Sequence, residues 1–375
     1  GGEGSDMSRP VKNKTQGFTL VELMVGLALG LLTVLVISQV LAMAEGKKRS
    51  VSMGSGAQVN GSLTLFTLQR DIQHAGYGIA QLPSSLGCLV KGKRSGADAF
   101  QFTLAPVVIN NGTSDGPDQL TVVQGQTTGF STPLTLTGDH GATATAFAVK
   151  SSFGVPAGSM MIAVPKLLGS GSTCTLFNVT HDATSPLTAI GPTRLPNGGG
   201  DAGPWNHSEL FPPGGYVTDD LLLHIGSLVR RTYAVSSAHN LQLSELSLTS
   251  GTDVTQDLYP QIVNLQAFYG KDTDANGVVD RYDAATPTTN DGWKQVLAIR
   301  IAVVARSNQY EKDEVTASAP LWDVGTSATF ADATPETCGA SKCIPLKVSQ
   351  LDQWKHYRYK VYDTIVPLRN VLWNS

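Results

Sequence analysis

Charged residues are scarce in this chain. They make up 15% of its 375 residues, against roughly 25% in typical soluble domains. The 27 Lys and Arg nearly balance the 30 Asp and Glu, so neither a polyanion-binding surface nor an acidic, solvating chain is indicated. Gly, Ser and Thr are abundant in the middle of the chain. This composition favours strands and turns there.

Motifs of common hydrolases are also missing. The sequence has no G-x-S-x-G and no H-E-x-x-H, and its seven histidines lack the spacing of metal ligands. Residues 87–94 come close to a phosphate-binding loop, but Arg94 stands where Ser or Thr would hold magnesium. Aromatic and basic residues alternate between Trp354 and Lys360, which favours a half-buried strand over a single-stranded DNA site. We therefore predict that the protein is not an enzyme and does not bind nucleic acid.

One segment, residues 18–44, departs from this composition because its only charge is Glu22. As a helix it would extend about 40 Å, enough to cross a hydrocarbon core of about 30 Å. The alternative is a cleaved secretory signal, with Ala42 and Ala44 as the small residues of its cleavage site. The apolar region of such a signal runs about 7–15 residues, far shorter than this one. We therefore predict a membrane-spanning helix. Basic residues on both sides leave its orientation open.

The junction before the apolar run resembles the processing site of type IV prepilins. Gly17 is followed by Phe18-Thr-Leu-Val-Glu22 and then by uninterrupted apolar residues. In that family a short basic leader stays in the cytoplasm, and a prepilin peptidase cuts after the glycine and methylates the new N-terminus. The resemblance implies a class III signal: residues 1–17 are removed, the cut falls between Gly17 and Phe18, and Phe18 is N-methylated.

Glu22 occupies the position of the family's acidic residue near the mature N-terminus. An isolated carboxylate within lipid is costly, so it is expected to be paired or functional. The resemblance supplies the free α-amine of Phe18 as its partner, on the same chain or on a neighbouring subunit. Such a buried pair would set the register of assembly. The alternative is a glutamate that only extends to the lipid headgroups.

The helix is predicted to continue through residues 45–76. An apolar face with spacings of three and four is formed by Leu65, Leu68, Ile72 and Ala75. Several glycines between Gly46 and Gly61 each disfavour helix by up to about 1 kcal/mol, so bending or fraying is expected there. Gly76 is a suitable C-terminal stop, because glycine readily adopts the left-handed conformation.

Residues 77–375 show short β-rich runs separated by turn residues, without a long helical period. The expected strands are residues 119–123, 146–149, 160–164, 220–235, 261–269, 296–305 and 357–366. Residues 191–215 are rich in Pro and Gly and indicate a long loop or a seam between subdomains. The predicted fold class is α+β: a long N-terminal helix, membrane-spanning in its first half, packed on an antiparallel β-rich globular domain.

Four cysteines allow three disulfide pairings, and their even number suits an oxidising compartment. Cys338 and Cys343 share one short segment, so we expect them to pair with each other and to leave Cys88 with Cys174. The alternative is a zinc site, but the sequence has no C-x-x-C pair and no histidine beside any cysteine.

Residues 272–283 have the spacing of a calcium-binding loop, in which positions 1, 3, 5, 9 and 12 offer side-chain ligands, position 6 is glycine and position 7 offers a carbonyl. The matching residues are Asp272, Asp274, Asn276, Gly277, Val278, Asp280 and Asp283. Crowded carboxylates repel each other unless a cation neutralises them. We therefore predict Ca2+ as a cofactor; the alternative is a polar hairpin turn without an ion. Flanking helices are not expected, because the preceding run reads as a strand.

Three further stretches resemble one subgroup of these proteins, the PilW-type minor pilins: residues 68–78, 269–274 and 357–370. The resemblance is thin between residues 81 and 215. It implies a minor pilin that helps to initiate type IV pilus assembly at the inner membrane, with its C-terminal domain in the periplasm, and that enters the fibre or its tip. The implied partners are other minor pilins, the major pilin, the prepilin peptidase and a tip adhesin.

Two other functions fit the same sequence. A type II secretion pseudopilin, acting as a piston tip, would share the leader, and the neighbouring genes would distinguish it. A membrane-tethered, calcium-dependent binding module would not be processed at Gly17.

Overall fold

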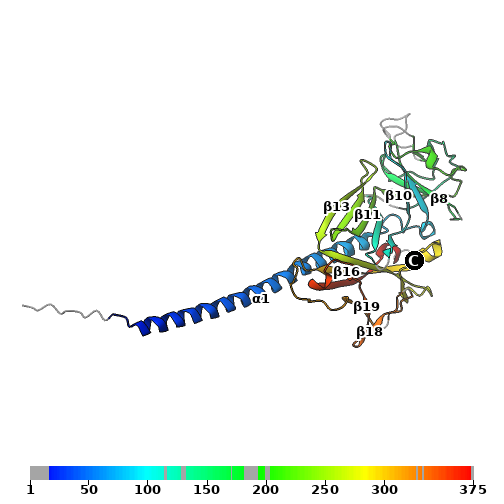
Figure 1. Ribbon diagram of the computed structural model, residues 1–375. Helices are drawn as coiled ribbons and strands as arrows, with labels where there is room; N and C mark the ends of the chain where they lie inside the picture. The colour runs from blue at the N-terminus through cyan, green and yellow to red at the C-terminus, as the bar shows by residue number, and fades with distance from the viewer. Residues whose placement is uncertain are drawn as a thin grey trace, which may run out of the picture. The chain divides into compact units, whose positions relative to one another are not determined.

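The computed structural model divides the chain into two compact units, Gly1–Met53 and Gly54–Ser375 (Figure 1). The structure describes residues 17–113, 116–127, 132–169, 171–180, 193–198, 203–326, 328–331 and 333–372. Most of the predicted leader, residues 1–16, therefore lies outside the described residues, as do parts of the predicted seam at 191–215. Helix α1, Leu20–His74, begins in the first unit and ends in the second.

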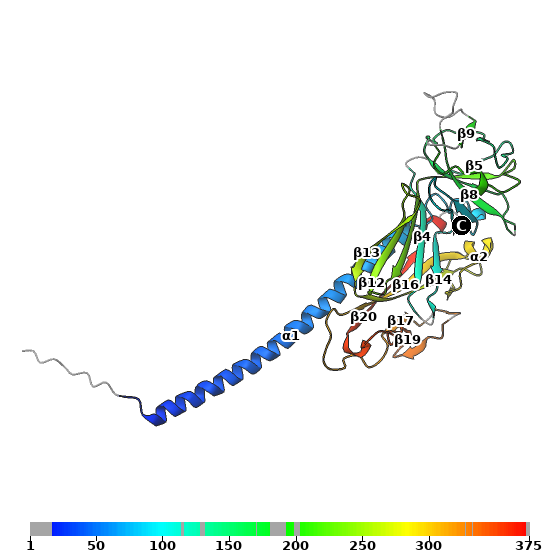
Figure 2. The same cartoon turned by 45° about the horizontal axis from the view of Figure 1, so that its top comes forward.

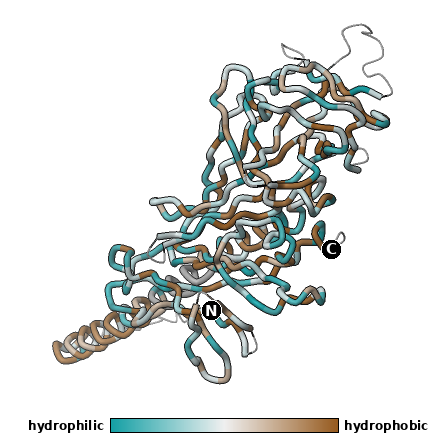
Figure 3. Tube along the Cα trace, turned by 90° about the vertical axis from the view of Figure 1, so that its right-hand side faces the viewer, coloured by the Kyte–Doolittle hydropathy of each residue, from teal (hydrophilic) through white to brown (hydrophobic). Residues whose placement is uncertain are grey.

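The first unit consists of the apolar part of α1. Residues Leu20–Glu45 have a mean hydropathy of 2.6, and none of this span is buried within the chain. Figure 3 colours these turns as hydrophobic. The helix is continuous between Gly46 and Gly61, where fraying was expected, because a glycine weakens a helix only modestly.

The second half of α1 packs into the largest core of the second unit. Leu68, Ile72 and Ala75 are fully buried there, and Gly76 closes the helix with φ at +81°. Two antiparallel sheets supply most of the rest of this core, and Figure 2 shows β4, β12 and β13 beside α1. One has the order β13-β12-β11-β4-β3, from Asp253–Pro260, Asn240–Leu246, Leu228–Val235, Gln119–Gly125 and Val107–Asn110. The other has the order β15-β14-β16-β20, from Arg281–Asp283, Ile262–Lys271, Val296–Arg306 and Tyr359–Pro367.

A six-stranded sheet forms one end of the second unit and contributes to two further cores, one of which also contains Val123, Leu228 and Leu246 of the five-stranded sheet. Its order is β2-β1-β8-β7-β10-β5, from Phe100–Thr103, Leu89–Gly92, Thr173–Asn178, Met160–Val164, Leu221–Gly226 and Leu134–Thr135. All its pairs are antiparallel except β1 with β8. Strands β6 (Ala146–Ala148) and β9 (Arg194–Pro196) form a separate pair.

A three-stranded sheet lies at the opposite end of this unit (Figure 1). It contains β17 (Leu321–Gly325), β19 (Ser341–Pro345) and β18 (Glu336–Cys338). The remaining helices are short: α2 (Asn290–Lys294), α3 (Arg369–Leu372) and the 3-10 turns Pro83–Ser85, Ser208–Leu210 and Trp354–His356. The described part of residues 191–215 contains β9 and the middle 3-10 turn.

The predicted α+β class is confirmed, and one predicted strand is wrong. Residues 220–235 form two strands, β10 and β11, that belong to different sheets. Gly226, the last residue of β10, has φ at +68°, and a side chain there would press against the backbone of Gln126. The chain therefore turns at Gly226 where the apolar pattern indicates one long strand.

A buried carboxylate joins α1 to the five-stranded sheet. Asp71 is 4% exposed and accepts hydrogen bonds from the Tyr233 hydroxyl at 2.6 Å and from Arg231 Nη1 at 3.0 Å. Burial raises the pKa of Tyr233, and the Asp71 carboxylate raises it further, so this hydroxyl stays a donor. A buried charge without its hydrogen-bond partners is strongly destabilising, so these bonds fix how the helix is rotated against the sheet.

Gly61 lets α1 approach β20 closely, and this contact gives a prediction. A Cβ at Gly61 would overlap the ring of Tyr362, whereas a Cβ at Gly56 meets only Asn308 at 3.5 Å. We expect Gly61→Ala to lower the free energy of unfolding by about 1–3 kcal/mol. Gly56→Ala should leave it unchanged or raise it by up to about 1 kcal/mol. Chemical denaturation measures both; equal stability of the two variants would contradict this packing.

Candidate functional site

The predicted processing site lies immediately before α1. Gly17 and Phe18 precede the helix, and the Phe18 side chain is 84% exposed. The Glu22 amide donates to Thr19 Oγ1 at 3.2 Å, and the Leu23 amide donates to the Thr19 carbonyl at 3.1 Å. Thr19 therefore caps the helix, and Thr-x-x-Glu is the sequence of a capping box.

Glu22 consequently lies in the first turn of α1. A carboxylate there interacts favourably with the positive end of the helix dipole, so Glu22 has a local role besides the predicted one. Phe18 lies just before the helix, four residues from Glu22 in the sequence.

The side chains that follow Glu22 are exposed along the whole apolar span. Leu23, Leu27 and Leu31, for example, are each 61–63% exposed. An apolar surface of this length that no other described residue of the chain covers requires lipid or another helix. The span is long and apolar enough to cross a membrane.

The acidic loop between β14 and β15 brings three of the predicted calcium ligands together. Carboxylate oxygens of Asp272, Asp274 and Asp280 lie within 4.8 Å of one another. Asp274 and Asp280 are exposed and Asp272 is buried. Across the described part of the chain, no Lys or Arg forms an ion pair with any of these three. Their mutual repulsion is therefore left to solvent or to a bound cation.

Backbone amides hold the Asp272 carboxylate in place. It accepts hydrogen bonds from Gly277 N at 2.7 Å and Asn276 N at 3.1 Å. Burial raises its pKa, but these hydrogen bonds outweigh burial and the net pKa is lowered. Asp280 likewise accepts from Thr273 N at 2.7 Å. Gly277 has φ at +82°, the left-handed turn expected at the sixth position.

The other predicted ligands lie differently. Asp283, the predicted twelfth-position ligand, lies apart from these three carboxylates: it is buried in β15, where Lys271 Nζ approaches its Oδ1 to 2.6 Å, and it does not belong to the acidic cluster. The Asn276 side chain donates to Asp274 and accepts from Val278 N at 2.8 Å. Val278 lies in the loop with a 64% exposed side chain.

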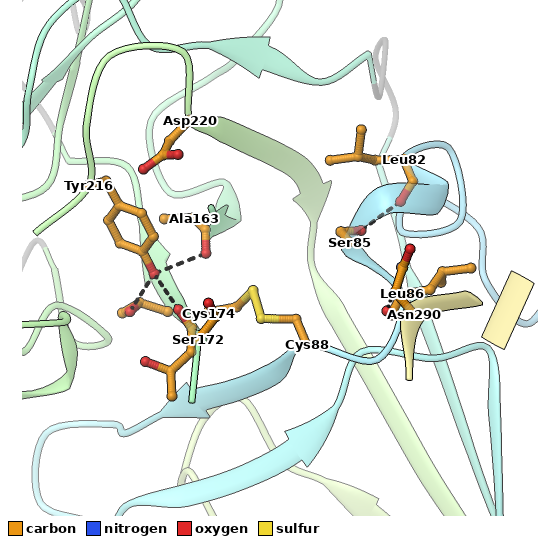
Figure 4. The surroundings of a disulfide bond; sticks show 12 residues. Leu82, Ser85, Leu86, Cys88, Ala163, Ser172, Cys174, Tyr216, Asp220 and Asn290 are labelled. Carbon is orange, nitrogen blue, oxygen red and sulfur yellow. Dashed lines mark hydrogen bonds between the residues drawn. A yellow bond between two sulfur atoms is a disulfide. The ribbon is translucent and has the colours of Figure 1, made fainter. Parts of the chain in front are cut away.

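The cysteines pair as expected from the sequence, Cys88 with Cys174 and Cys338 with Cys343. The first bond joins the residue before β1 to β8, and Figure 4 shows it close to Tyr216 and Ser172. The second closes the β18–β19 hairpin.

Sequence reasoning missed three buried carboxylates, Asp71, Asp118 and Asp220. Asp71 interrupts an apolar helix face, a signal that could have been noticed. No sequence signal marks Asp118. Burial raises the pKa of its carboxyl group to about 6, although the amides of Gly112 and Ala267 donate hydrogen bonds to it and lower the pKa. It joins the loop after β3 to β14, a pairing visible only in three dimensions.

Two family models match the chain. One, described as Type IV Pilus-assembly protein W, covers residues 225–370. The other, described as Prokaryotic N-terminal methylation motif, covers residues 12–38. No curated protein and no solved structure matches the chain. The second match includes the predicted cleavage site, whereas nearly all of the six-stranded sheet lies outside both.

The two disulfides should differ in their effect on stability. Cys88–Cys174 spans 86 residues and Cys338–Cys343 spans 5. The loop-closure model assigns about 4–5 kcal/mol to the long loop and about 2 kcal/mol to the short one. We therefore expect Cys88→Ala/Cys174→Ala to reduce the free energy of unfolding about twice as much as Cys338→Ala/Cys343→Ala. Denaturant titration of the two double variants checks this; equal losses would argue against it.

Proposed function

We propose that this chain, a pilin of the PilW type with a class III signal, helps to initiate type IV pilus assembly at the inner membrane and then enters the fibre or its tip. The family matches confirm the resemblance seen in the sequence and point to a structural pilin rather than an enzyme. The observation that carries the proposal is a methylation motif placed directly on an exposed, membrane-length apolar helix.

The disulfides support a periplasmic location for the second unit. Two cystines are stable in an oxidising compartment. Processing after Gly17 would leave the new N-terminus of Phe18 at the cytoplasmic face of the membrane, with Gly54–Ser375 on the other side.

Assembly would then use the charge at the start of α1. Once the leader is removed, Phe18 carries an ammonium group and Glu22 a carboxylate, both beside an apolar helix. Within lipid an unpaired carboxylate is unfavourable, so a neighbouring subunit that offers its own Phe18 amine would be selected in one register. Other minor pilins and the major pilin are the proposed partners, the prepilin peptidase acts on the leader, and an adhesin is a proposed partner at the tip.

A type II secretion pseudopilin is the second candidate, because it would use the same leader and helix. Loss of secreted proteins with normal surface pili would identify it. A tethered calcium-dependent binding module is the third candidate, and it would retain the leader.

Glu22 should be needed for pilus assembly, and Glu45, at the other end of the span, serves as a matched control. In cells that carry Glu22→Gln, we expect a mature N-terminus at methylated Phe18 and roughly tenfold fewer surface pili, since each 1.4 kcal/mol of lost pairing is about a factor of ten. Glu45→Gln should have normal pili. N-terminal mass spectrometry of membrane-extracted protein and pilus counts by electron microscopy provide the readouts.

Three outcomes would overturn parts of this proposal. A mature end at Glu45 would mean a cleaved secretory signal. An unprocessed leader would favour the binding module. Normal pilus numbers for Glu22→Gln, or for a strain without the protein, would remove the role in assembly.

We further propose that the acidic loop binds Ca2+. The donors fit a hard cation, because Asp272, Asp274 and Asp280 converge without an ion-pair partner among the described residues. Three carboxylates are fewer than the 6–8 oxygens that Ca2+ takes, so water and backbone carbonyls would complete the shell. A site of millimolar affinity would suffice outside the cytoplasm.

Calcium should therefore raise the melting temperature of the full-length chain. We expect this rise to be absent from Asp272→Asn/Asp274→Asn and retained in Asp98→Asn/Asp291→Asn, which removes two exposed carboxylates elsewhere. Thermal unfolding with calcium, magnesium or a chelator measures the shift. An equal calcium shift in both double variants would refute the site.

A further inference from the structure

A hollow of about 710 Å3 opens at one end of the six-stranded sheet. This is within the roughly 300–1,000 Å3 of ligand sites. It lies outside both family matches. Its walls come from β1, from the segments that flank β7, β8 and β10, and from the loop after the Ser208–Leu210 turn.

The frame of this hollow is held rigidly. Cys174 at the base of β8 is bonded to Cys88, and the Tyr216 hydroxyl lies 3.1 Å from the Ala163 carbonyl (Figure 4). The Asp220 carboxylate accepts hydrogen bonds from the amides of Lys166 and Val217, both at 2.8 Å. Because these bonds tie two rim segments together, little ordering is needed when a ligand enters.

The charges of the walls leave one cation without a partner. Lys166 pairs with Asp219 at 3.1 Å, Glu209 pairs with Lys93 at 3.1 Å, and Asp220 is occupied by the two amides. Lys91, on β1, also lines the hollow, and within the described ranges its ammonium has neither an ion pair nor a hydrogen bond. The ligand should therefore bring an anionic group.

The apolar walls indicate what accompanies that group. Leu167 is 83% exposed and Val217 is 54% exposed, and three prolines lie beside them. Phe211 is only 6% exposed, so it offers no open aromatic face on which a sugar ring could stack. Exposed aliphatic side chains beside a cation fit a polypeptide segment with aliphatic and acidic residues.

We propose that this hollow binds an extended polypeptide segment of a partner protein in which a carboxylate lies next to aliphatic side chains. Lys91 pairs with the carboxylate, and Leu167 and Val217 pack against the aliphatic groups. The inference does not depend on the pilus or on calcium, since it uses neither Glu22 nor the acidic loop.

The test uses the full-length chain in phosphatidylcholine nanodiscs and two labelled peptides, acetyl-LELEL-amide and acetyl-LQLQL-amide. Fluorescence polarisation should show saturable binding of the acidic peptide that is tighter than that of the glutamine peptide. We expect Lys91→Met to weaken only the acidic peptide, about three- to fivefold. Val217→Ser should weaken both. Lys150→Met, which removes an exposed lysine of the same end of the unit, should change neither.

Each contrary result overturns the proposal. Binding no greater than to empty nanodiscs, or equal binding of the two peptides, excludes an acidic segment. A loss in Lys150→Met as large as in Lys91→Met excludes a specific role for Lys91. Full displacement by isovalerate at the concentration of the peptide would show that a small carboxylate, and not a polypeptide, is the ligand.

Discussion

The second unit depends on one buried charge, the Asp71 carboxylate. It is held by Tyr233 and Arg231 of the five-stranded sheet, and it is the buried carboxylate on a helix face whose other buried side chains are uncharged. An apolar face alone would tolerate rotation or a shift of the helix by one turn, whereas a charge without its donors is strongly unfavourable. Asp71 therefore sets the register that lets Gly61 meet Tyr362 and lets Leu68 and Ile72 fill the core between two sheets.

One helix thus serves two surroundings. Its first half exposes every apolar side chain and requires lipid or another helix, while the second half is buried by its own chain. Polar residues form hydrogen bonds in both parts: Thr19 accepts from the Glu22 amide at the start of the helix, and Asp71 accepts from Tyr233 near its end. The folded core fixes the second half, which leaves the first half free to take its partners from the membrane.

The sequence predicted what depends on near neighbours along the chain. The membrane helix, the stop at Gly76 and strands such as Met160–Val164 follow from length, periodicity and glycine. The polar strand Asp253–Pro260 lacks a buried face, so its sequence has no alternation of apolar and polar residues from which a strand could be predicted. The pairing of Lys271 with Asp283, a predicted calcium ligand, depends on strand pairing between β14 and β15. The donors to Asp118 come from segments far away in sequence.

The bond between Cys88 and Cys174 also has a mechanical consequence. Tension applied to a sheet is borne by the hydrogen bonds between its strands unless a covalent bond carries the load. Here a pull on β8 passes through the sulfur atoms to Cys88 and along residues 75–88 to the end of α1, bypassing residues 89–173 between the two cysteines. The load would be carried by covalent bonds, and the parallel pairing of β1 with β8 would be spared.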